Sequence, residues 1–287
     1  MSDHSFIKKS DWLLKEDMWI QQYVDEDTVE GSFETWQADE IYKYENISWW
    51  YTYRKKILYM VCDKYFDNKK MIVDIGGGNG LVADYLRQRG FNTGLIEPSY
   101  RSCKYALKRG VKNVYCGTVD AESILDNSLP QVMLLDVLEH IEDDEKFYKL
   151  IFDKIVPGGL LLLTVPAFMS LWSSEDVGSG HYRRYTLPQI KMLVERWGGQ
   201  IAFENYFFGF LYYPVLLGRV FAERVGLIKK LQDRNQVEYS KERDRQYVSQ
   251  SKIVNIVLNC FESNEMKKIF NKKIRRGSSL VVVIKKV

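Results

Sequence analysis

The segment Met71–Gly80, MIVDIGGGNG, leads an apolar run directly into four glycines, with Asp74 just ahead of them. A β-strand that ends in glycines lets backbone N–H groups approach a ligand with no Cβ in the way. The helix that follows points the positive end of its dipole at the same place. The segment therefore predicts a strand, a turn and a helix that together bind a nucleotide or a nucleotide-like cofactor.

Short apolar runs alternate with helix-patterned segments through the middle of the chain, which is typical of a parallel sheet covered by helices on both faces. We expect a helical lead-in over residues 1–69, an α/β core over 70–207, a helical insertion over 208–277 and a last core strand over 278–287. The predicted strands are Met71–Ile75, Thr93–Glu97, Val114–Cys116, Val132–Asp136, Leu160–Val165, Gln200–Tyr206 and the terminal SSLVVVIKK.

Composition excludes several classes of protein. The 287 residues are 46% hydrophobic and 28% charged with a net charge of +3, which fits neither a disordered chain nor one drawn strongly to nucleic acid. Four scattered cysteines without CxxC spacing indicate neither a disulfide framework nor a zinc site, and they fit the reducing cytoplasm. The longest apolar stretch, Phe207–Leu217, is too short to span a bilayer.

The spacing of the glycines separates two kinds of cofactor site. A dinucleotide site needs the frame G-x-G-x-x-G directly after the strand, and here Leu81 takes the place of the third glycine. The spacing that fits is Asp74-x-Gly76-x-Gly78-x-Gly80, an acid followed by three alternating glycines. Either pattern alone leaves the cofactor open.

Two further acids follow the next two predicted strands. Glu97 ends the second strand, where a carboxylate can accept hydrogen bonds from both ribose hydroxyls of NAD or of S-adenosylmethionine. Asp120 follows the third strand, where it could bind the exocyclic amine of adenine. The same aspartate also fits an ordinary surface turn.

A longer pattern then resembles one family. The run LLDVLEHIEDDEKFYKLIFDKIVPGGLLLLTVPA joins a strand, a Glu-His pair, a helix, a Pro-Gly-Gly turn and another strand. Together with DIGGGNG and Glu97, it resembles the class I S-adenosylmethionine-dependent methyltransferases over roughly residues 70–207 and the last strand. The resemblance implies a Rossmann-like α/β fold whose seven-stranded sheet has an antiparallel last strand. It implies S-adenosylmethionine as the cofactor, with contacts from Asp74, Gly76, Gly78, Gly80, Glu97, Asp120, Asp136 and Leu138.

Three other segments narrow the resemblance to a bacterial type-11/type-23-like group often met in glycan or lipid biosynthesis. They are ENISWWYTYRKK, LWSSEDVGSGHYRRYT and the ending GSSLVVVIKK after a long insertion. The group resemblance implies O-methylation of a sugar or lipid-type small molecule. One departure is Gln131, where the family usually has an aspartate; that position is mainly structural.

Methyl transfer from a sulfonium requires alignment of donor and acceptor, and removal of a proton when the acceptor is a hydroxyl, so neither a metal nor a covalent nucleophile is required. His140 follows the fourth strand and His181 lies in a glycine-containing loop after the fifth, and both are candidate bases. His140 could instead cap or pack the following helix. Asp136, Glu139 and His140 could alternatively contribute to a divalent metal site.

The loop around His181 also carries candidate substrate residues. Arg183 and Arg184 suit a phosphate or carboxylate on the acceptor, with Tyr185 beside them. Trp50 and Arg54 of the lead-in are candidate lid residues. The arginines could instead tie the loop to Glu175 or Asp176. Residues 207–226 and 267–276, the first aromatic and the second basic, could contact the inner face of a membrane, although an insertion packed on the core or a dimer contact is the simpler explanation.

The sequence thus predicts a cytoplasmic methyltransferase that acts on a small molecule and not on nucleic acid, with no signal for an oligomeric state. N-methylation and C-methylation stay open as alternatives, as does a non-catalytic binding protein on the same fold. A nicotinamide-dependent oxidoreductase is disfavoured by Leu81 and by the lack of a Tyr-x-x-x-Lys pair in the expected region.

Overall fold

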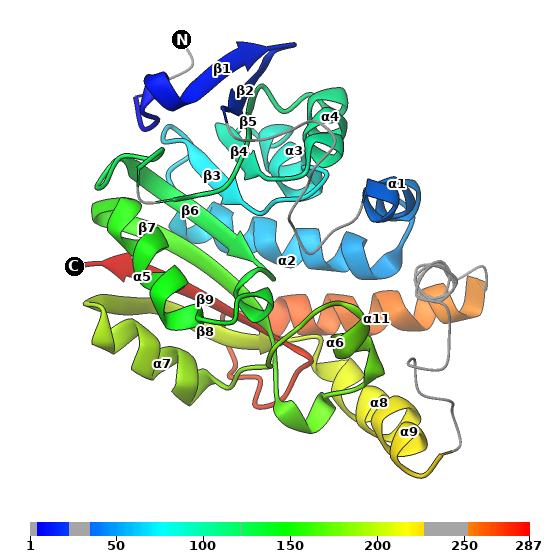
Figure 1. Ribbon diagram of the computed structural model, residues 1–287. Helices are drawn as coiled ribbons and strands as arrows, with labels where there is room; N and C mark the ends of the chain where they lie inside the picture. Colours follow the sequence, from blue (N-terminus) through cyan, green and yellow to red (C-terminus); the bar gives the residue numbers. More distant parts are fainter. Residues whose placement is uncertain (1–4, 23–34, 121, 227–251) are drawn as a thin grey trace.

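The computed structural model of the protein describes residues 5–22, 35–120, 122–226 and 252–287. These residues form a nine-stranded sheet with helices on both faces (Figure 1). The order across the sheet is β1-β2-β5-β4-β3-β6-β7-β9-β8. The strands are β1 (Trp12–Lys15), β2 (Met18–Gln21), β3 (Ile72–Ile75), β4 (Thr93–Glu97), β5 (Asn113–Cys116), β6 (Leu129–Leu135), β7 (Ile155–Pro166), β8 (Gly199–Phe207) and β9 (Ser279–Lys286).

Strand directions confirm the predicted core. Strands β5, β4, β3, β6 and β7 pair in parallel, and β9 is antiparallel to both β7 and β8. The sequence analysis did not predict β1 and β2, which form an antiparallel hairpin within the expected helical lead-in. Strand β2 pairs in parallel with β5 and so extends the sheet by one hairpin at that edge.

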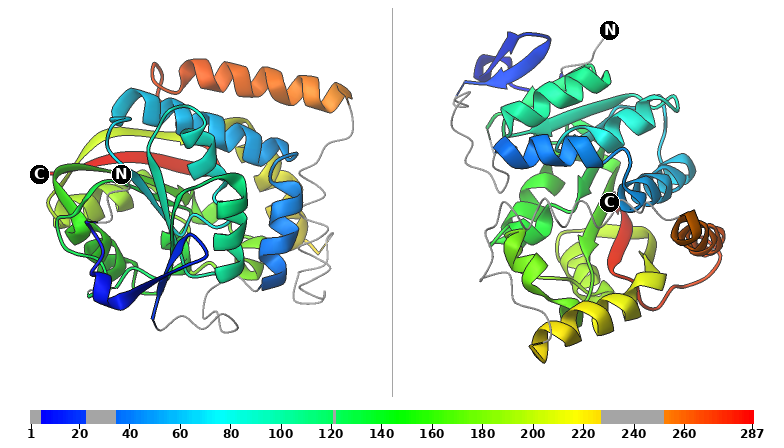
Figure 2. Two further views of the ribbon diagram at one scale, coloured as in Figure 1. Left: turned by 90° about the horizontal axis from the view of Figure 1, so that it is seen from above. Right: turned by 90° about the vertical axis from the view of Figure 1, so that its right-hand side faces the viewer.

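Helices cover the sheet on two sides (Figure 2). One face carries α2, α3, α4 and α11, and the other carries α5 and α7. The helices are α1 (Thr35–Tyr44), α2 (Trp49–Tyr65), α3 (Leu81–Arg87), α4 (Tyr100–Arg109), α5 (Asp144–Lys154), α6 (Ser174–Gly178), α7 (Leu187–Arg196), α8 (Tyr212–Val215), α9 (Ala222–Arg224) and α11 (Lys252–Lys268).

The apolar runs of the central strands result from burial on both faces. In β6, Val132 and Leu134 pack towards α5, while Met133 and Leu135 pack towards α2. A parallel strand covered on both sides needs apolar residues at every position, so its sequence reads as a continuous run and does not alternate. The carboxyl ends of β3 to β7 meet at one edge of the sheet, where the predicted site residues lie.

In the predicted insertion, 208–277, the described residues form helical segments over 209–224 and 252–268, and 269–277 are not helical. A π-helical segment, Leu216–Phe221, joins α8 to α9, and α11 runs alongside α2. The hydroxyl of Tyr53 in α2 donates a hydrogen bond of 2.6 Å to Glu265 in α11, which ties the insertion to the lead-in helix. The mixed-charge part of the insertion, residues 227–251, lies outside the described residues.

Candidate functional site

The glycine turn after β3 has open space beside Gly78 and close packing beside Gly80. Gly78 (φ +53°) has no atom within 4 Å of the position that a Cβ would take. A Cβ on Gly80 (φ +72°) would lie 2.8 Å from the Cβ of Ala106 in α4. Gly80 is therefore required for packing of the turn against α4, whereas the open side of Gly78 is available to a ligand.

Two buried carboxyl groups flank this turn. Glu97 at the end of β4 accepts hydrogen bonds of 2.9 Å from the N–H groups of Gly78 and Ser99, one on each oxygen. Asp74 in β3 is 1% exposed, and its Oδ1 has no hydrogen-bond partner among the described residues. Burial, partly offset by the charge of Arg54, raises the pKa of Asp74 to about 7. An unpaired buried acceptor here fits a cationic ligand group such as the ammonium of S-adenosylmethionine.

Asp120 lies in the turn after β5 and is held on both oxygens. Its Oδ1 accepts from the N–H groups of Glu122 (2.8 Å) and Ser123 (2.6 Å). Its Oδ2 accepts from the side-chain amide of Gln21 at 2.6 Å. The turn therefore presents a fixed carboxylate beside the carboxyl end of β5, as an adenine-binding role requires.

Asp136 and Leu138 follow β6. Asp136 has a left-handed backbone (φ +57°) and accepts a hydrogen bond from Thr164 at 3.0 Å. Its other oxygen forms an ion pair of 2.8 Å with the buried Arg54 of α2. Leu138 is fully buried, and its carbonyl accepts a hydrogen bond from the hydroxyl of Tyr185 at 3.3 Å.

Trp50 of α2 packs in a cluster of aromatic side chains. Its ring stacks on Phe208 with centroids 5.5 Å apart, and the guanidinium of Arg54 lies 5.6 Å from its centroid. Phe208 is itself held in a left-handed conformation (φ +55°) directly after β8. A bulky residue in this backbone conformation is rare and is typical of sites where the surrounding structure enforces it.

The two candidate histidines lie together. The ring centroids of His140 and His181 are 4.7 Å apart, and the side chain of Glu139 is close enough that one ligand atom from each of the three lies within 4.8 Å of the others. Burial and the neighbouring His181 lower the pKa of His140 to about 4, so its ring is neutral at pH 7. Burial and the nearby Asp136 raise the pKa of Glu139.

Asp176 of α6 holds the loop that carries His181. Its Oδ1 lies 2.9 Å from Nδ1 of His181 and accepts a hydrogen bond of 2.7 Å from Nε of Arg184. Burial alone would raise the pKa of Asp176, but the hydrogen bond from His181 and the charge of Arg184 keep it below its ordinary value. An ionised, fully buried carboxylate is thus hydrogen-bonded to Nδ1 of His181.

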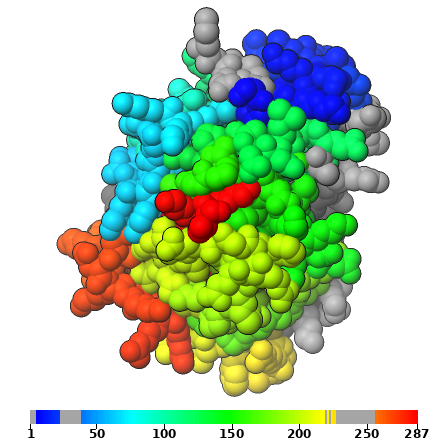
Figure 3. All heavy atoms as spheres, turned by 90° about the vertical axis from the view of Figure 1, so that its left-hand side faces the viewer, coloured from blue at the N-terminus to red at the C-terminus, as the bar shows by residue number. Residues whose placement is uncertain are grey.

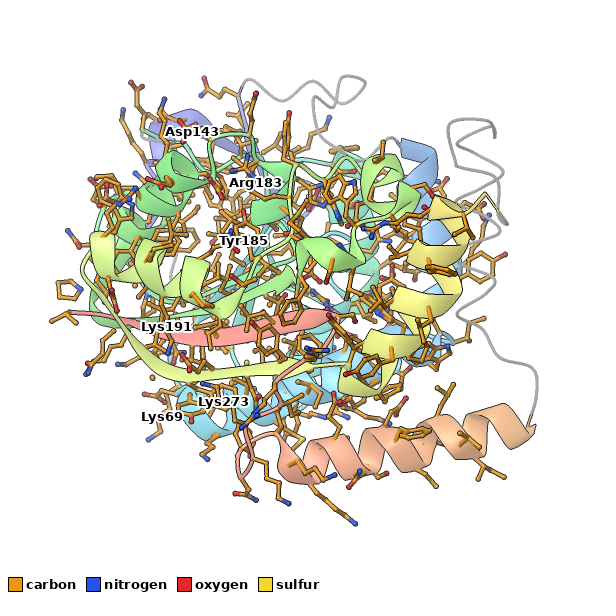
Figure 4. All side chains as sticks on the ribbon, turned by 90° about the horizontal axis from the view of Figure 1, so that it is seen from below. Lys69, Asp143, Arg183, Tyr185, Lys191 and Lys273 are labelled. Carbon is orange, nitrogen blue, oxygen red and sulfur yellow. The ribbon has the colours of Figure 1, made fainter. Side chains whose placement is uncertain are left out.

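The other predicted substrate residues are also bonded within the protein. Arg183 forms an ion pair of 2.8 Å with Asp144, and the hydroxyl of Tyr185 donates to the other oxygen of Asp144 at 2.7 Å. Figure 4 labels Arg183 and Tyr185, which point towards the start of α5, where Asp143 is also labelled. These contacts match the alternative in which the arginines tie the loop to acidic residues. That Arg183, Arg184 and Tyr185 contact a substrate stays a prediction.

Three residues at the site were not selected from the sequence. Arg54 was weighed only as a lid residue, Asp176 only as a partner for the arginines, and Gln21 not at all. Ser173 and Asp176 form a capping box, which marks a helix start but carries no sign of the contact with His181. The partners of Arg54 and Gln21 lie far away in the sequence, and no local pattern singles out Asp176 as the partner of His181.

Comparisons with known proteins identify a family for the chain. The methyltransferase-domain family matches residues 42–204, more than half of the chain. A ubiquinone biosynthesis O-methyltransferase of Rickettsia felis is 30% identical over 113 residues, which cover 38% of this chain and 46% of the relative. The chain therefore matches about half the length of this curated relative.

Solved structures share the fold at low sequence identity. A putative methyltransferase from Haloferax volcanii, in complex with its Trm112 activator, covers 90% of this chain and 97% of its own, with a TM-score of 0.55 and 14% identity. The cyclase SpnF covers 81% of each chain, with a TM-score of 0.51 and 16% identity. The glycine turn, the buried acids and the family match lead to one conclusion: the protein belongs to the methyltransferase-domain family of the class I S-adenosylmethionine-dependent methyltransferases.

Proposed function

We propose that the protein transfers a methyl group from S-adenosylmethionine to a hydroxyl of a sugar or lipid-type small molecule. The observation that carries this proposal is the pairing of Asp176 with His181 beside His140, at the sheet edge where an acceptor would meet the cofactor. A relative named as an O-methyltransferase of ubiquinone biosynthesis supports a hydroxyl acceptor. The protein SpnF shares the fold but is named a cyclase and not a methyltransferase. Because one fold can carry different reactions, methyl transfer by this chain has to be tested directly.

The cofactor supplies an activated methyl group, and the chain's own residues would hold it. Glu97 would take the ribose hydroxyls, Asp120 the adenine amine, and Asp74 the cationic amino acid end. The backbone of Gly76, Gly78 and Gly80 would lie along the cofactor, and Asp136 and Leu138 would border it after β6. The unpaired oxygen of Asp74 and the open side of Gly78 are the observations that favour this placement.

His181 is the base in this proposal. A hydrogen bond from Nδ1–H to Asp176 fixes the tautomer that leaves Nε2 able to accept a proton. When Nε2 takes the proton of the acceptor hydroxyl, the ionised Asp176 stabilises the resulting imidazolium. His140 is neutral at pH 7, so we assign it a hydrogen bond to the acceptor and not the proton transfer.

An acceptor panel tests this function. Purified protein with labelled S-adenosylmethionine is mixed with sugars, lipid-linked glycans, lipid-tailed phenols and small amines, and label transfer is measured. We expect transfer to a hydroxyl acceptor and its loss in His181→Gln. Transfer only to amines would identify an N-methyltransferase, and cofactor binding without transfer to any acceptor would favour the non-catalytic alternative.

We further propose that the protein is cytoplasmic and rests on the inner face of a membrane through its helical insertion. Within the described residues, no helix has both the length and the apolar character needed to cross a bilayer. From α8 to the residue that follows α9, an apolar residue at every fourth position is at least half exposed: Tyr213, Leu217, Phe221 and Val225.

A basic segment borders this apolar stripe. Arg276 donates a hydrogen bond of 3.0 Å to the hydroxyl of Tyr213, so the basic segment 267–276 lies against the start of α8. In Figure 3 the segment from α8 to α9 lies at the bottom of the molecule in yellow, and the basic segment lies at the lower left in orange-red. Exposed apolar residues rimmed by cations suit an anionic lipid surface.

Sedimentation with vesicles tests this contact. We expect the protein to bind vesicles that contain phosphatidylserine at low salt, and to bind neutral vesicles less. The double variant Leu217→Ser/Phe221→Ser should lose binding, whereas Leu14→Ser, which removes a side chain that is 64% exposed on β1, should not. Vesicle binding unaffected by the double variant, or loss of a dimer in its place, would contradict the proposal.

A further inference from the structure

The N-terminal hairpin packs on the turn that carries Asp120. The indole N–H of Trp12 and the backbone N–H of Lys8 both donate to the carbonyl of Ser123, at 3.2 and 3.0 Å. The N–H of Leu125 donates to the carbonyl of Phe6 at 2.8 Å. Residues that precede the methyltransferase core, 70–207, by about sixty positions therefore fix the far end of this turn.

At the start of the turn, Gly117 packs closely against the same hairpin. A Cβ on Gly117 would lie 2.5 Å from Oε1 of Gln21 and 3.0 Å from the ring of Trp12. Only a glycine allows the hairpin to approach the backbone this closely. The N–H of Gly117 also donates to the carbonyl of Glu97 at 3.0 Å, so the contact lies next to the predicted ribose carboxylate.

The oxygen and the nitrogen of the Gln21 side-chain amide both form hydrogen bonds to the turn. Its Oε1 accepts from the N–H of Thr118 at 3.0 Å, and its Nε2 donates to Oδ2 of Asp120 at 2.6 Å. Gln21 is 5% exposed, so neither bond competes freely with water. A carboxylate oxygen has two lone pairs, and Gln21 occupies one on Oδ2, which leaves the other for a ligand.

We infer that Gln21 is a positioning residue for the adenine ring of the cofactor, acting through Asp120. By holding Oδ2, it fixes the direction in which the carboxylate accepts a hydrogen bond from the exocyclic amine. The hairpin is then part of the cofactor site and contributes to its selectivity for adenine. This inference rests on the proposed role of Asp120.

The test compares two ligands by calorimetric titration: S-adenosylhomocysteine and its deaminated analogue S-inosylhomocysteine, which has a carbonyl in place of the amine. Gln21→Met keeps the length of the side chain and removes both hydrogen bonds. We expect it to weaken binding of S-adenosylhomocysteine about tenfold while leaving the analogue nearly unchanged, because only the amine uses Asp120. The wild-type preference for adenine should therefore shrink.

Two further variants control the result. Gln22→Met changes the adjacent glutamine, whose amide donates to the carbonyl of Ser10 and does not contact the turn, so both affinities should stay at wild-type values. Gln21→Glu keeps an acceptor for the N–H of Thr118 but places a second carboxylate against Oδ2 of Asp120, so repulsion should turn Asp120 away and remove the same selectivity. It also serves as the test if Gln21→Met proves too unstable to titrate.

Two outcomes would overturn the inference. Equal weakening of both ligands would show that Gln21 only maintains the fold, and unchanged affinity for both would show that Asp120 does not need it. Failure of the proposed function appears elsewhere, in the wild-type protein, as an absence of S-adenosylhomocysteine binding. If Asp120→Ala leaves the preference for adenine intact, the role of Asp120 is wrong and the inference about Gln21 fails with it.

Discussion

The two halves of the site are held in different ways. At the ends of β4 and β5, backbone N–H groups fix the carboxylates: Glu97 accepts from Gly78 and Ser99, and Asp120 accepts from the two N–H groups that follow in its own turn. At the ends of β6 and β7, side chains hold one another. Backbone N–H groups therefore fix most of the cofactor half, with one added bond from the side chain of Gln21, whereas the acceptor half depends on contacts between side chains.

The acceptor half shows this dependence directly. Asp136 is paired with Arg54 from the lead-in helix, and Asp176 bonds both His181 and Arg184. We expect variation in this half to alter the acceptor and the rate, and variation in the cofactor half to alter cofactor affinity.

The largest effect should come from filling the open side of the glycine turn. Gly78→Leu places a side chain where nothing lies within 4 Å, so the fold should persist while S-adenosylhomocysteine binding weakens by about a thousandfold. Gly90→Leu is the matched control, since Gly90 also has a left-handed backbone (φ +91°) and open space. Both variants carry the same kind of backbone strain, and only the first should lose the ligand in calorimetry.

Equal affinities in the two glycine variants would contradict the assignment of the turn to the cofactor. Loss of folding in Gly78→Leu alone, seen as a lost thermal transition, would show that the turn is structural.

This cofactor half is also the part that the sequence predicted best. An apolar strand, alternating glycines and an acid at the end of the next strand are local patterns, and the structure places Asp74, Gly78 and Glu97 together. The hairpin was missed because its turn residues are Glu16 and Asp17, both with positive φ (48° and 64°). Hairpin turns of this kind are usually marked by Asn-Gly or Asp-Gly, so the signal was absent.

The acceptor half was predicted as a set of residue types without their pairings. His140 and His181 were selected and lie together, with ring centroids 4.7 Å apart. The bond between Asp176 and His181 and the contacts of Arg54 and Asp144 were not predicted, because pairs of polar side chains leave no periodicity or spacing in the sequence. Such pairings depend on how α2, α5 and α6 pack around the sheet edge.

A second prediction separates the halves by kinetics. Asp176→Asn removes the charge behind His181, so kcat should fall on the order of 100-fold while cofactor affinity stays unchanged. Asp153→Asn is the control, because the side chain of Asp153 pairs with Lys149 at the surface and such pairs contribute little. A loss of cofactor affinity in Asp176→Asn, or full activity, would break the division between the two halves.

A third prediction uses the pH dependence of cofactor affinity. Because burial raises the pKa of Asp74 to about 7, this carboxyl group is neutral below that pH and attracts the ammonium group of the ligand less. Affinity for S-adenosylhomocysteine should weaken by up to about tenfold for each pH unit below that pKa and level off above it. Asp74→Asn should bind more weakly with no such dependence, and a flat wild-type profile would contradict the role of Asp74.

The raised pKa of Asp74 also makes the stability of the folded protein depend on pH. The folded protein without ligand favours protonated Asp74, so this contribution is complete below the ordinary aspartate pKa and is lost as pH rises through about 7. The melting temperature of the unliganded protein should fall over this range more steeply than that of Asp74→Asn. Parallel melting profiles would show that Asp74 does not titrate in this window.

The smallest expected effect is that of metal removal. Glu139, His140 and His181 could supply ligands, but the proposed proton transfer uses only His181 and Asp176. Methyl transfer should therefore be unchanged after treatment with EDTA and gel filtration. Loss of activity that Mg²⁺ or Zn²⁺ restores would replace the base mechanism with a metal site at these three residues.

The central claim is that the carboxyl ends of β3, β4 and β5 hold S-adenosylmethionine. The most direct test is calorimetric titration of the wild-type protein with S-adenosylmethionine, S-adenosylhomocysteine and NAD, run side by side. We predict saturable binding of the first two and none of NAD. Binding of NAD alone, or of none of the three, would contradict the claim.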